Sequence, residues 1–214
     1  MSDACKCIAA PPRMTVTTIA VIGAKDAGRA IAAAAGLAGY CTILEDVSCE
    51  TLERAMKAIK KSLDECVECG ERTTEERDAA TLGIHPENKI EAAIRDADLI
   101  IETVPEELEM KLELFTIFDK FAKPGAIFAS TTTTLSILDI SDVTVYRERC
   151  IGLRFQDAGV KTLELTRTEL TAADVLSACE ELALRVKREL RVNWDLAKQG
   201  TTSTTARVAD MPEA

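Results

Sequence analysis

Val21-Ile22-Gly23-Ala24-Lys25-Asp26-Ala27-Gly28 is the stretch that decides the fold of this 214-residue chain. The short, β-branched run at 17–22 ends at Gly23 and predicts a buried parallel strand. From Ala27 onward the sequence AGRAIAAAAGLAG has helical composition, with small side chains that suit a helix packed closely on a sheet. A strand, a tight glycine turn and a helix N-terminus bring unpaired backbone N–H groups together with the helix dipole. The stretch therefore predicts a cradle for phosphate groups.

The glycine spacing resembles the G-x-G-x-x-G pattern of a dinucleotide-binding turn. Gly23 and Gly28 stand at the first and third positions, and Lys25 occupies the second. A glycine at the second position lets the backbone approach a pyrophosphate closely. Lys25 therefore either adds a cation beside the phosphates or obstructs them. The predicted phosphate-binding residues are Gly23, Ala24 and Gly28.

A second strand, predicted at 40–45, ends at Asp46, about twenty residues beyond the glycine turn. An acid in this place hydrogen-bonds the adenosine ribose hydroxyls of a dinucleotide. The same carboxylate would repel a 2′-phosphate, so the predicted cofactor is NAD rather than NADP. No metal site is predicted.

Composition restricts the class of partner. The chain has a net charge of −10, with 47% apolar and 29% charged residues, as expected for a globular protein. The negative charge argues against binding to nucleic acid or to an anionic membrane. No apolar run is long enough to span a bilayer. The 8 cysteines are scattered, which favours reduced thiols and a cytoplasmic protein, with a mitochondrial location left open.

Strand and helix patterns alternate along residues 16–190. The interpretation is an α/β, Rossmann-type, doubly wound and mostly parallel sheet with helices on both faces. A helical insertion is predicted at 48–82, after the second strand, with Ser48 as the cap of a long helix. Residues 1–15 are interpreted as a flexible leader and residues 191–214 as a disordered or loosely attached tail. A helix capped by Thr171 is predicted to run to about Leu190.

Two further segments carry a resemblance to a known family. ADLIIETVPEELEMKLELF at 97–115 and IFASTTTTLSI at 127–137 resemble the ADLVIEAVPE…K.ELF and ILASNTSSLSI motifs of the 3-hydroxyacyl-CoA dehydrogenase family. The resemblance covers residues 16–190, and the helical insertion is also a family trait. It implies NAD as cofactor, oxidation of a 3-hydroxyacyl-type secondary alcohol, and a place in fatty acid metabolism.

The resemblance also implies site residues. Glu106 and Lys111 stand where the family has the acid and the lysine that approach the nicotinamide end of NAD. Thr133 stands where the family has the serine that contacts substrate and cofactor. Glu164 stands where the family has the acid that orients a catalytic histidine. The histidine itself, in the family run G-L-H-F-F-N-P, is replaced by Arg154.

Arg154 changes the expected chemistry, because a guanidinium cannot take the hydroxyl proton as imidazole does. An arginine beside Glu164 indicates a salt bridge. The acidic end of the long insertion helix, at 64–68, would repel the phosphates of CoA, and the helical second domain of the family is not recognisable in the sequence. Two hypotheses therefore stand. One is an oxidoreductase acting on an acyl-CoA or small hydroxy acid with impaired catalysis. The other is a non-catalytic NAD-binding or scaffold subunit with a protein partner or a second copy.

Three other features have plainer interpretations. His85, the only histidine, lies beside a proline and is interpreted as a structural or exposed loop residue. Cys66 and Cys69 have redox or zinc spacing, but no second pair completes a site, so two surface thiols are the favoured interpretation. Cys5 and Cys7 likewise lack further ligands nearby.

Overall fold

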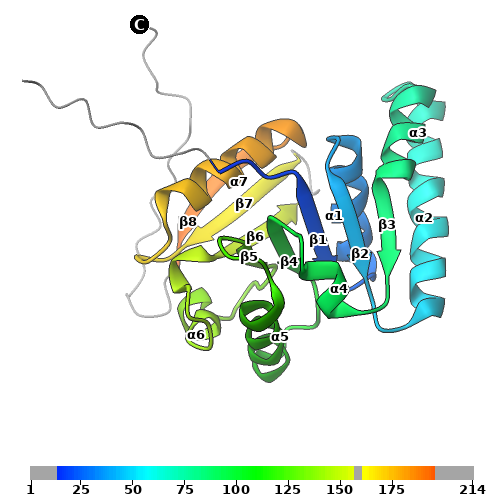
Figure 1. Ribbon diagram of the computed structural model, residues 1–214. Coiled ribbons are helices and arrows are strands. Elements are labelled where there is room, and N and C mark those ends of the chain that lie inside the picture. The colour runs from blue at the N-terminus through cyan, green and yellow to red at the C-terminus, as the bar shows by residue number, and fades with distance from the viewer. Residues whose placement is uncertain (1–13, 157–160, 196–214) are drawn as a thin grey trace, which may run out of the picture.

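Eight strands form one sheet in the order β3-β2-β1-β4-β5-β6-β7-β8 (Figure 1). This arrangement comes from a computed structural model that describes residues 14–156 and 161–195. Neighbouring strands run parallel except β6 and β7, which are antiparallel. The predicted α/β fold with a mostly parallel sheet is confirmed. The strands are β1 (Thr18–Ile22), β2 (Cys41–Glu45), β3 (Ile84–Glu87), β4 (Leu99–Glu102), β5 (Ile127–Ser130), β6 (Cys150–Gln156), β7 (Thr162–Arg167) and β8 (Glu189–Trp194).

Helices cover both faces of the sheet (Figure 1). Residues of α1, α2, α3 and α7 share one core cluster with the strands, and residues of α4, α5 and α6 share the other. The sheet is therefore the middle layer of three. The helices are α1 (Asp26–Leu37), α2 (Cys49–Glu68), α3 (Thr74–Gly83), α4 (Ile90–Ile94), α5 (Leu108–Phe121), α6 (Ile137–Ser141) and α7 (Ala173–Arg185), with a 3₁₀ turn η1 (Arg147–Arg149) before β6.

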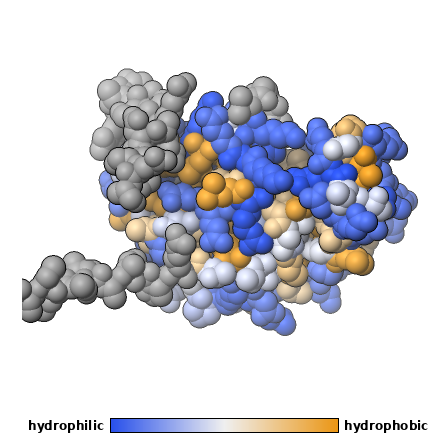
Figure 2. All heavy atoms as spheres, turned by 90° about the horizontal axis from the view of Figure 1, so that it is seen from above, coloured by the Kyte–Doolittle hydropathy of each residue, from blue (hydrophilic) through white to orange (hydrophobic). Residues whose placement is uncertain are grey.

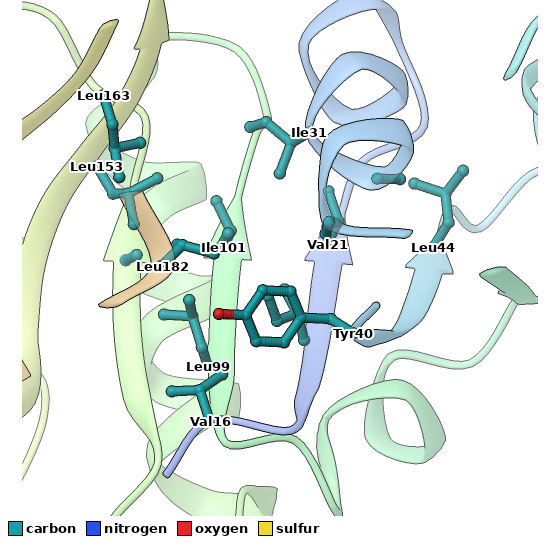
Figure 3. Close-up of a cluster of buried hydrophobic side chains, with 14 of the residues drawn as sticks. Val16, Val21, Ile31, Tyr40, Leu44, Leu99, Ile101, Leu153, Leu163 and Leu182 are labelled. Atoms are coloured by element: carbon teal, nitrogen blue, oxygen red, sulfur yellow. The ribbon is translucent and has the colours of Figure 1, made fainter. Parts of the chain in front are cut away.

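The larger core cluster lies between the sheet and helices α1 and α7 (Figure 3). Tyr40 is 2% exposed and lies near Leu99, which is 1% exposed. Burying an aliphatic side chain of this size contributes about 1.5–3 kcal/mol. The view from above shows hydrophilic side chains over most of the visible surface, with hydrophobic ones in separate patches (Figure 2). The buried hydrophobic side chains of the described residues belong to the two core clusters.

The insertion between β2 and β3 consists of two capped helices. The Ser48 hydroxyl accepts a hydrogen bond from the Thr51 amide at the start of α2, as predicted. Thr73 and Glu76 form a capping box at the start of α3. These caps satisfy backbone donors that a helix N-terminus otherwise leaves unpaired. The helical insertion predicted from the sequence is confirmed.

The end of the domain differs from the prediction. Helix α7 begins at Ala173 without a side-chain cap, because the Thr171 hydroxyl instead accepts from the Thr168 amide. The helix ends at Arg185, and the chain returns as β8, parallel to β7. Residues 191–195 were predicted to begin a disordered tail, and this boundary is wrong. The alternation of apolar Leu190 and Val192 with polar neighbours is a strand pattern.

Strand β3 was also not predicted. It forms one edge of the sheet, where Pro86 is tolerated because an edge strand leaves some N–H positions without a ladder partner. His85 lies in this strand rather than in a loop, and it is exposed, as expected. Across residues 14–156 and 161–195, no helix is long and apolar enough to cross a membrane. The predicted leader up to residue 13 and the tail from residue 196 lie outside the described residues.

Candidate functional site

The glycine turn after β1 has the geometry of a close backbone crossing. Gly23 has a φ of 104°, a backbone conformation that residues other than glycine rarely adopt. Its amide donates to the Glu45 carbonyl at 2.9 Å. The Thr103 hydroxyl donates to the carbonyls of Ile22 and Gly23 at 2.9 and 3.0 Å. A Cβ on Gly23 would lie 2.7 Å from the same hydroxyl oxygen. The turn is thus fixed against β4 and admits only glycine at its first position.

Gly28 is the point where α1 meets this turn. A Cβ added to Gly28 would lie 1.8 Å from the Gly23 carbonyl oxygen. Lys25 occupies the N-cap position of α1, with ordinary φ and ψ of −80° and −164° and an exposed side chain. The second position of the glycine pattern therefore needs no glycine to form the turn. The two glycines that the backbone does require are both present, so the turn fits a dinucleotide phosphate group.

Asp46 joins the end of β2 to the glycine turn. One oxygen of its carboxylate accepts from the Ala24 amide at 3.2 Å and the other from the Ser48 amide at 3.0 Å. The carboxylate is thereby held beside the phosphate cradle, and it retains lone pairs that ribose hydroxyls can use. The structure thus brings the predicted residues Gly23, Ala24, Gly28 and Asp46 together.

Glu45, the residue before Asp46, is a functional candidate that sequence reasoning missed. Its side chain is only 3% exposed, and within the described residues its Oε1 atom has no hydrogen-bond partner. Burial, with smaller effects from the carboxylates of Asp46, Glu87 and Glu91, raises the pKa of Glu45 to about 7. The sequence signal was an acid at a position where the strand pattern expects an apolar residue.

The raised pKa of Glu45 predicts a pH effect on stability. The unfolded chain releases this proton near pH 4.5, whereas the folded chain holds it to about pH 7. The free energy of unfolding should therefore fall as the pH rises from 4.5 to 7. We expect the free energy of unfolding of Glu45→Gln to equal that of the parent chain at pH 4. At pH 8 it should exceed that of the parent chain by on the order of 2 kcal/mol. Urea unfolding at both pH values measures this, and an equal difference at both would contradict it.

A fully buried ion pair lies under the ends of β4 and β5. The Lys111 ammonium lies 2.8 and 2.9 Å from the two carboxylate oxygens of Glu102, and both side chains are 0% exposed. The Ser130 hydroxyl and the Val104 amide also donate to Glu102, at 2.7 Å each. The sequence resemblance assigned Lys111 to the nicotinamide end of NAD. In the structure its ammonium lies inside the protein, where it supports these strand ends.

Glu106 ties the loop after β5 to the loop after β4. Its Oε1 atom accepts from the Thr132 hydroxyl at 2.6 Å, and from the amides of Thr133 and Thr134 at 2.8 and 2.9 Å. The Lys111 ammonium lies 3.6 Å from its other oxygen. The Thr133 hydroxyl lies 3.4 Å from the Glu106 Oε1 atom, so its hydrogen bond is the longest and weakest of these. Glu106 therefore sets the shape of the threonine loop, residues 131–134.

The hydrogen bonds to Glu106 predict a titration at very low pH. Burial alone would raise the pKa of Glu106, but hydrogen bonds from the threonine loop outweigh it and lower the pKa to about 2. The stability that these bonds add is fully present above pH 4.5 and is lost as the pH falls through 2. In a ¹H–¹⁵N NMR titration we expect the Thr133 amide signal to move near pH 2. A midpoint near 4.5 would contradict this, and Glu106→Gln should show no such step.

Arg154 and Glu164 face each other across β6 and β7. They are paired in the antiparallel register, and the guanidinium Nη2 and Nε atoms lie 2.5 and 3.2 Å from one carboxylate oxygen. The Glu164 side chain is 14% exposed and that of Arg154 is 37% exposed. The salt bridge expected from the sequence is confirmed. A carboxylate engaged in this way holds the arginine in place.

A cleft of about 360 Å³ lies between the threonine loop and the strands β7 and β8. Asp195, just after β8, closes one side of it. Its carboxylate accepts from the Ser136 hydroxyl and the Leu138 amide, both at 2.9 Å, at the start of α6. Sequence reasoning missed Asp195 because it placed this segment in the tail. The lining residues are Thr132–Ile137, Thr166, Trp194 and Asp195.

The other candidate groups do not form sites. Cys66 and Cys69 lie at the end of α2 as free thiols, and burial raises the pKa of Cys66. Among residues 14–156 and 161–195, no group of three or more His, Cys, Asp or Glu side chains could hold a metal ion. Cys5 and Cys7 lie outside the described residues.

Comparison with known proteins agrees with this geometry. Residues 18–193 match the family model "3-hydroxyacyl-CoA dehydrogenase, NAD binding domain". The chain is 34% identical over 175 residues to the probable 3-hydroxybutyryl-CoA dehydrogenase of Bacillus subtilis, covering 79% of this chain and 61% of that protein. It is 32% identical to the 3-hydroxybutyryl-CoA dehydrogenase of Bradyrhizobium diazoefficiens, covering 84% of this chain and 62% of the relative.

Solved structures give the same result. The crystal structure of 3-hydroxybutyryl-CoA dehydrogenase from Escherichia coli K12 superposes with a TM-score of 0.81 at 31% identity, covering 85% of this chain and 39% of that one. The chain thus spans less than two thirds of the length of these relatives. The match nevertheless includes the glycine turn, the threonine loop and the Arg154–Glu164 pair. The chain belongs to the 3-hydroxyacyl-CoA dehydrogenase family, of which residues 18–193 form the NAD-binding domain.

Proposed function

We propose that this chain binds NAD across the carboxyl ends of β1, β2, β4 and β5. The backbone of Gly23 and Ala24 and the close approach at Gly28 would receive the pyrophosphate at the N-terminus of α1. Asp46 would accept hydrogen bonds from the adenosine ribose. This part of the proposal is supported by the required glycines, and by the carboxylate that is fixed to the Ala24 amide at 3.2 Å.

At the nicotinamide end, we assign positioning roles to Glu106 and Lys111. Glu106 holds the threonine loop through its hydrogen bonds, and Lys111 holds Glu106 and Glu102 from the protein interior. The Thr133 hydroxyl makes the longest contact of the three loop hydroxyls that reach Glu106, at 3.4 Å, and it would contact substrate and cofactor. Ser130 completes this support through its hydrogen bond to Glu102.

The chemistry that NAD supplies when bound is acceptance of a hydride from the alcohol carbon of a 3-hydroxyacyl-type substrate. The protein must then accept the hydroxyl proton, and this needs a group whose pKa lies near the working pH. A guanidinium does not serve as a general base, and that of Arg154 contacts Glu164 at 2.5 Å. We therefore propose that this chain turns over such a substrate poorly. The Arg154–Glu164 pair is the single observation that carries this proposal.

The alternative is a non-catalytic NAD-binding or scaffold subunit of a larger assembly. The specific observation in its favour is again Arg154, which replaces the proton acceptor. The acidic end of α2 favours this non-catalytic alternative less than the sequence suggested, because two of its acids are paired with cations. Asp64 lies 2.7 Å from Arg77, and Glu65 lies 3.7 Å from Lys61. Repulsion of CoA by this surface is therefore weaker than a count of its acids implies.

The test is an assay of 3-hydroxybutyryl-CoA oxidation, followed by NADH formation. We expect the parent chain to show little or no turnover. Arg154→His supplies an imidazole beside Glu164 and should raise the rate on the order of 100-fold, the usual contribution of a general base. Arg154→Gln is the matched control, because it removes the cation without supplying a base, and it should remain inactive.

The outcomes separate the two candidates. A parent chain that turns over as fast as Arg154→His would contradict impaired catalysis. If NADH binds to every variant but none shows turnover, the non-catalytic subunit is the correct function.

A further inference from the structure

The side chains at the level of Arg154 form a row across three strands. Arg154 in β6 pairs with Glu164 in β7, and Glu164 pairs with Arg191 in β8. Residues paired in register on neighbouring strands project from the same face of a sheet. The row is therefore arginine, glutamate, arginine, with two guanidinium groups for one carboxylate.

This row lies next to the cleft beside the threonine loop. Gly152 and Thr166 occupy the neighbouring row on the same face, and a Cβ on Gly152 would lie 2.8 Å from the Thr166 Cβ and 3.3 Å from Ile137 of α6. Thr166 and Ile137 both line the cleft. Two residues along a strand advance about 7 Å. Neither arginine is among the residues that line the cleft, but an arginine side chain is about as long as this distance, so both guanidinium groups lie within reach of a ligand at the edge of the cleft.

The positive charge of the row is only partly neutralised. Both nitrogens of Arg154 that contact Glu164 share a single oxygen, Oε2. Arg191 is exposed, and its side chain has no hydrogen bond or ion pair within the described residues. The Asp195 carboxylate also lines the cleft, but it already accepts hydrogen bonds from Ser136 and Leu138, so the arginine row is the side of the cleft that is suited to an anion. A guanidinium presents its N–H groups as a planar fork that matches a carboxylate.

We propose that the cleft takes a substrate with a free carboxylate, a small 3-hydroxy or 3-oxo acid, and that Arg154 and Arg191 bind this carboxylate. The inference rests on the proposed NAD site, because it places the ligand beside Thr133. It assigns to Arg154 a role in substrate choice that replaces proton transfer. A neutral ester or thioester of the same acid would leave the second guanidinium without a counterion.

The test compares acetoacetate with its neutral methyl ester by ligand-observed NMR titration, with and without NADH. We expect acetoacetate to bind the parent chain at least about tenfold more tightly than the ester, as for a charge-assisted hydrogen bond. Arg191→Met should remove most of this preference, and it leaves the Arg154–Glu164 pair intact. Arg154→Met should do the same. Arg95→Met, an exposed arginine beside α4, is the control of equal charge and should keep the preference.

Two results would overturn the inference. One is equal affinity of the parent chain for acetoacetate and the ester. The other is an unchanged preference in Arg191→Met and Arg154→Met. NADH affinity, measured in the same samples, is a separate readout. If NADH binds and acetoacetate is not preferred, only the carboxylate inference fails, whereas absence of NADH binding rejects the proposed function itself.

Discussion

Gly28→Ala is expected to abolish NADH binding and to lower the free energy of unfolding on the order of 3 kcal/mol. The new Cβ would lie 1.8 Å from the Gly23 carbonyl oxygen, which is a backbone atom and cannot rotate away. Either α1 must move off the sheet or the turn at Gly23 must open, and both changes destroy the phosphate cradle. Chemical denaturation measures the stability, and NADH fluorescence measures the binding.

The matched control is Gly83→Ala, which adds the same methyl group at the end of α3. There the new Cβ would meet only the Tyr40 carbonyl oxygen at 3.4 Å, an ordinary contact. Because alanine is also the better helix former, we expect a change within about 1 kcal/mol and unaltered NADH binding. Equal effects of the two substitutions would show that the close crossing at Gly28 is not required.

Lys111→Met is expected to destabilise the protein by about 3–5 kcal/mol, because it leaves the buried Glu102 carboxylate without its counterion. Both side chains are 0% exposed, so water cannot replace the ammonium. Ser130 and the Val104 amide still donate to Glu102, but neither carries a positive charge. Guanidinium unfolding of the parent and the variant at pH 7 measures the loss.

A double variant identifies the origin of this loss. Lys111→Met combined with Glu102→Gln removes both charges together, and it should recover most of the stability. Lys60→Met, on the exposed surface of α2, is the surface control and should change the stability by less than about 0.5 kcal/mol. If Lys111→Met leaves stability intact and weakens only NADH binding, Lys111 is a cofactor residue after all. If the double variant is as unstable as the single one, the loss does not arise from the unpaired charge.

Local patterns in the sequence predicted the half of the domain nearest the glycine turn. Strand β1, the turn at Gly23 and the Ser48 cap of α2 each depend on a few adjacent residues, so propensity and capping rules suffice. The Asp46 position follows from a fixed spacing after the turn. These features were predicted because the physical cause and the sequence signal lie in the same stretch.

The remaining features depend on contacts between distant segments. The Glu102–Lys111 pair cannot be distinguished in the sequence from two surface charges, since only the packing of α5 against β4 buries them. Strand β8 alternates apolar and polar residues for too few positions to stand out, and pairing with β7 makes it a strand. The role of Asp195 follows from β8, because that strand brings it to the start of α6.

The most direct test of the central claim is a fluorescence titration of the purified chain with NADH and, separately, with NADPH. The claim is that Gly23, Gly28 and Asp46 form a working NAD cleft although Lys25 replaces the middle glycine. It predicts saturable binding of NADH at one site, with affinity for NADPH at least about tenfold weaker because Asp46 repels the 2′-phosphate. Absence of saturable NADH binding, or equal affinity for the two nucleotides, would contradict it.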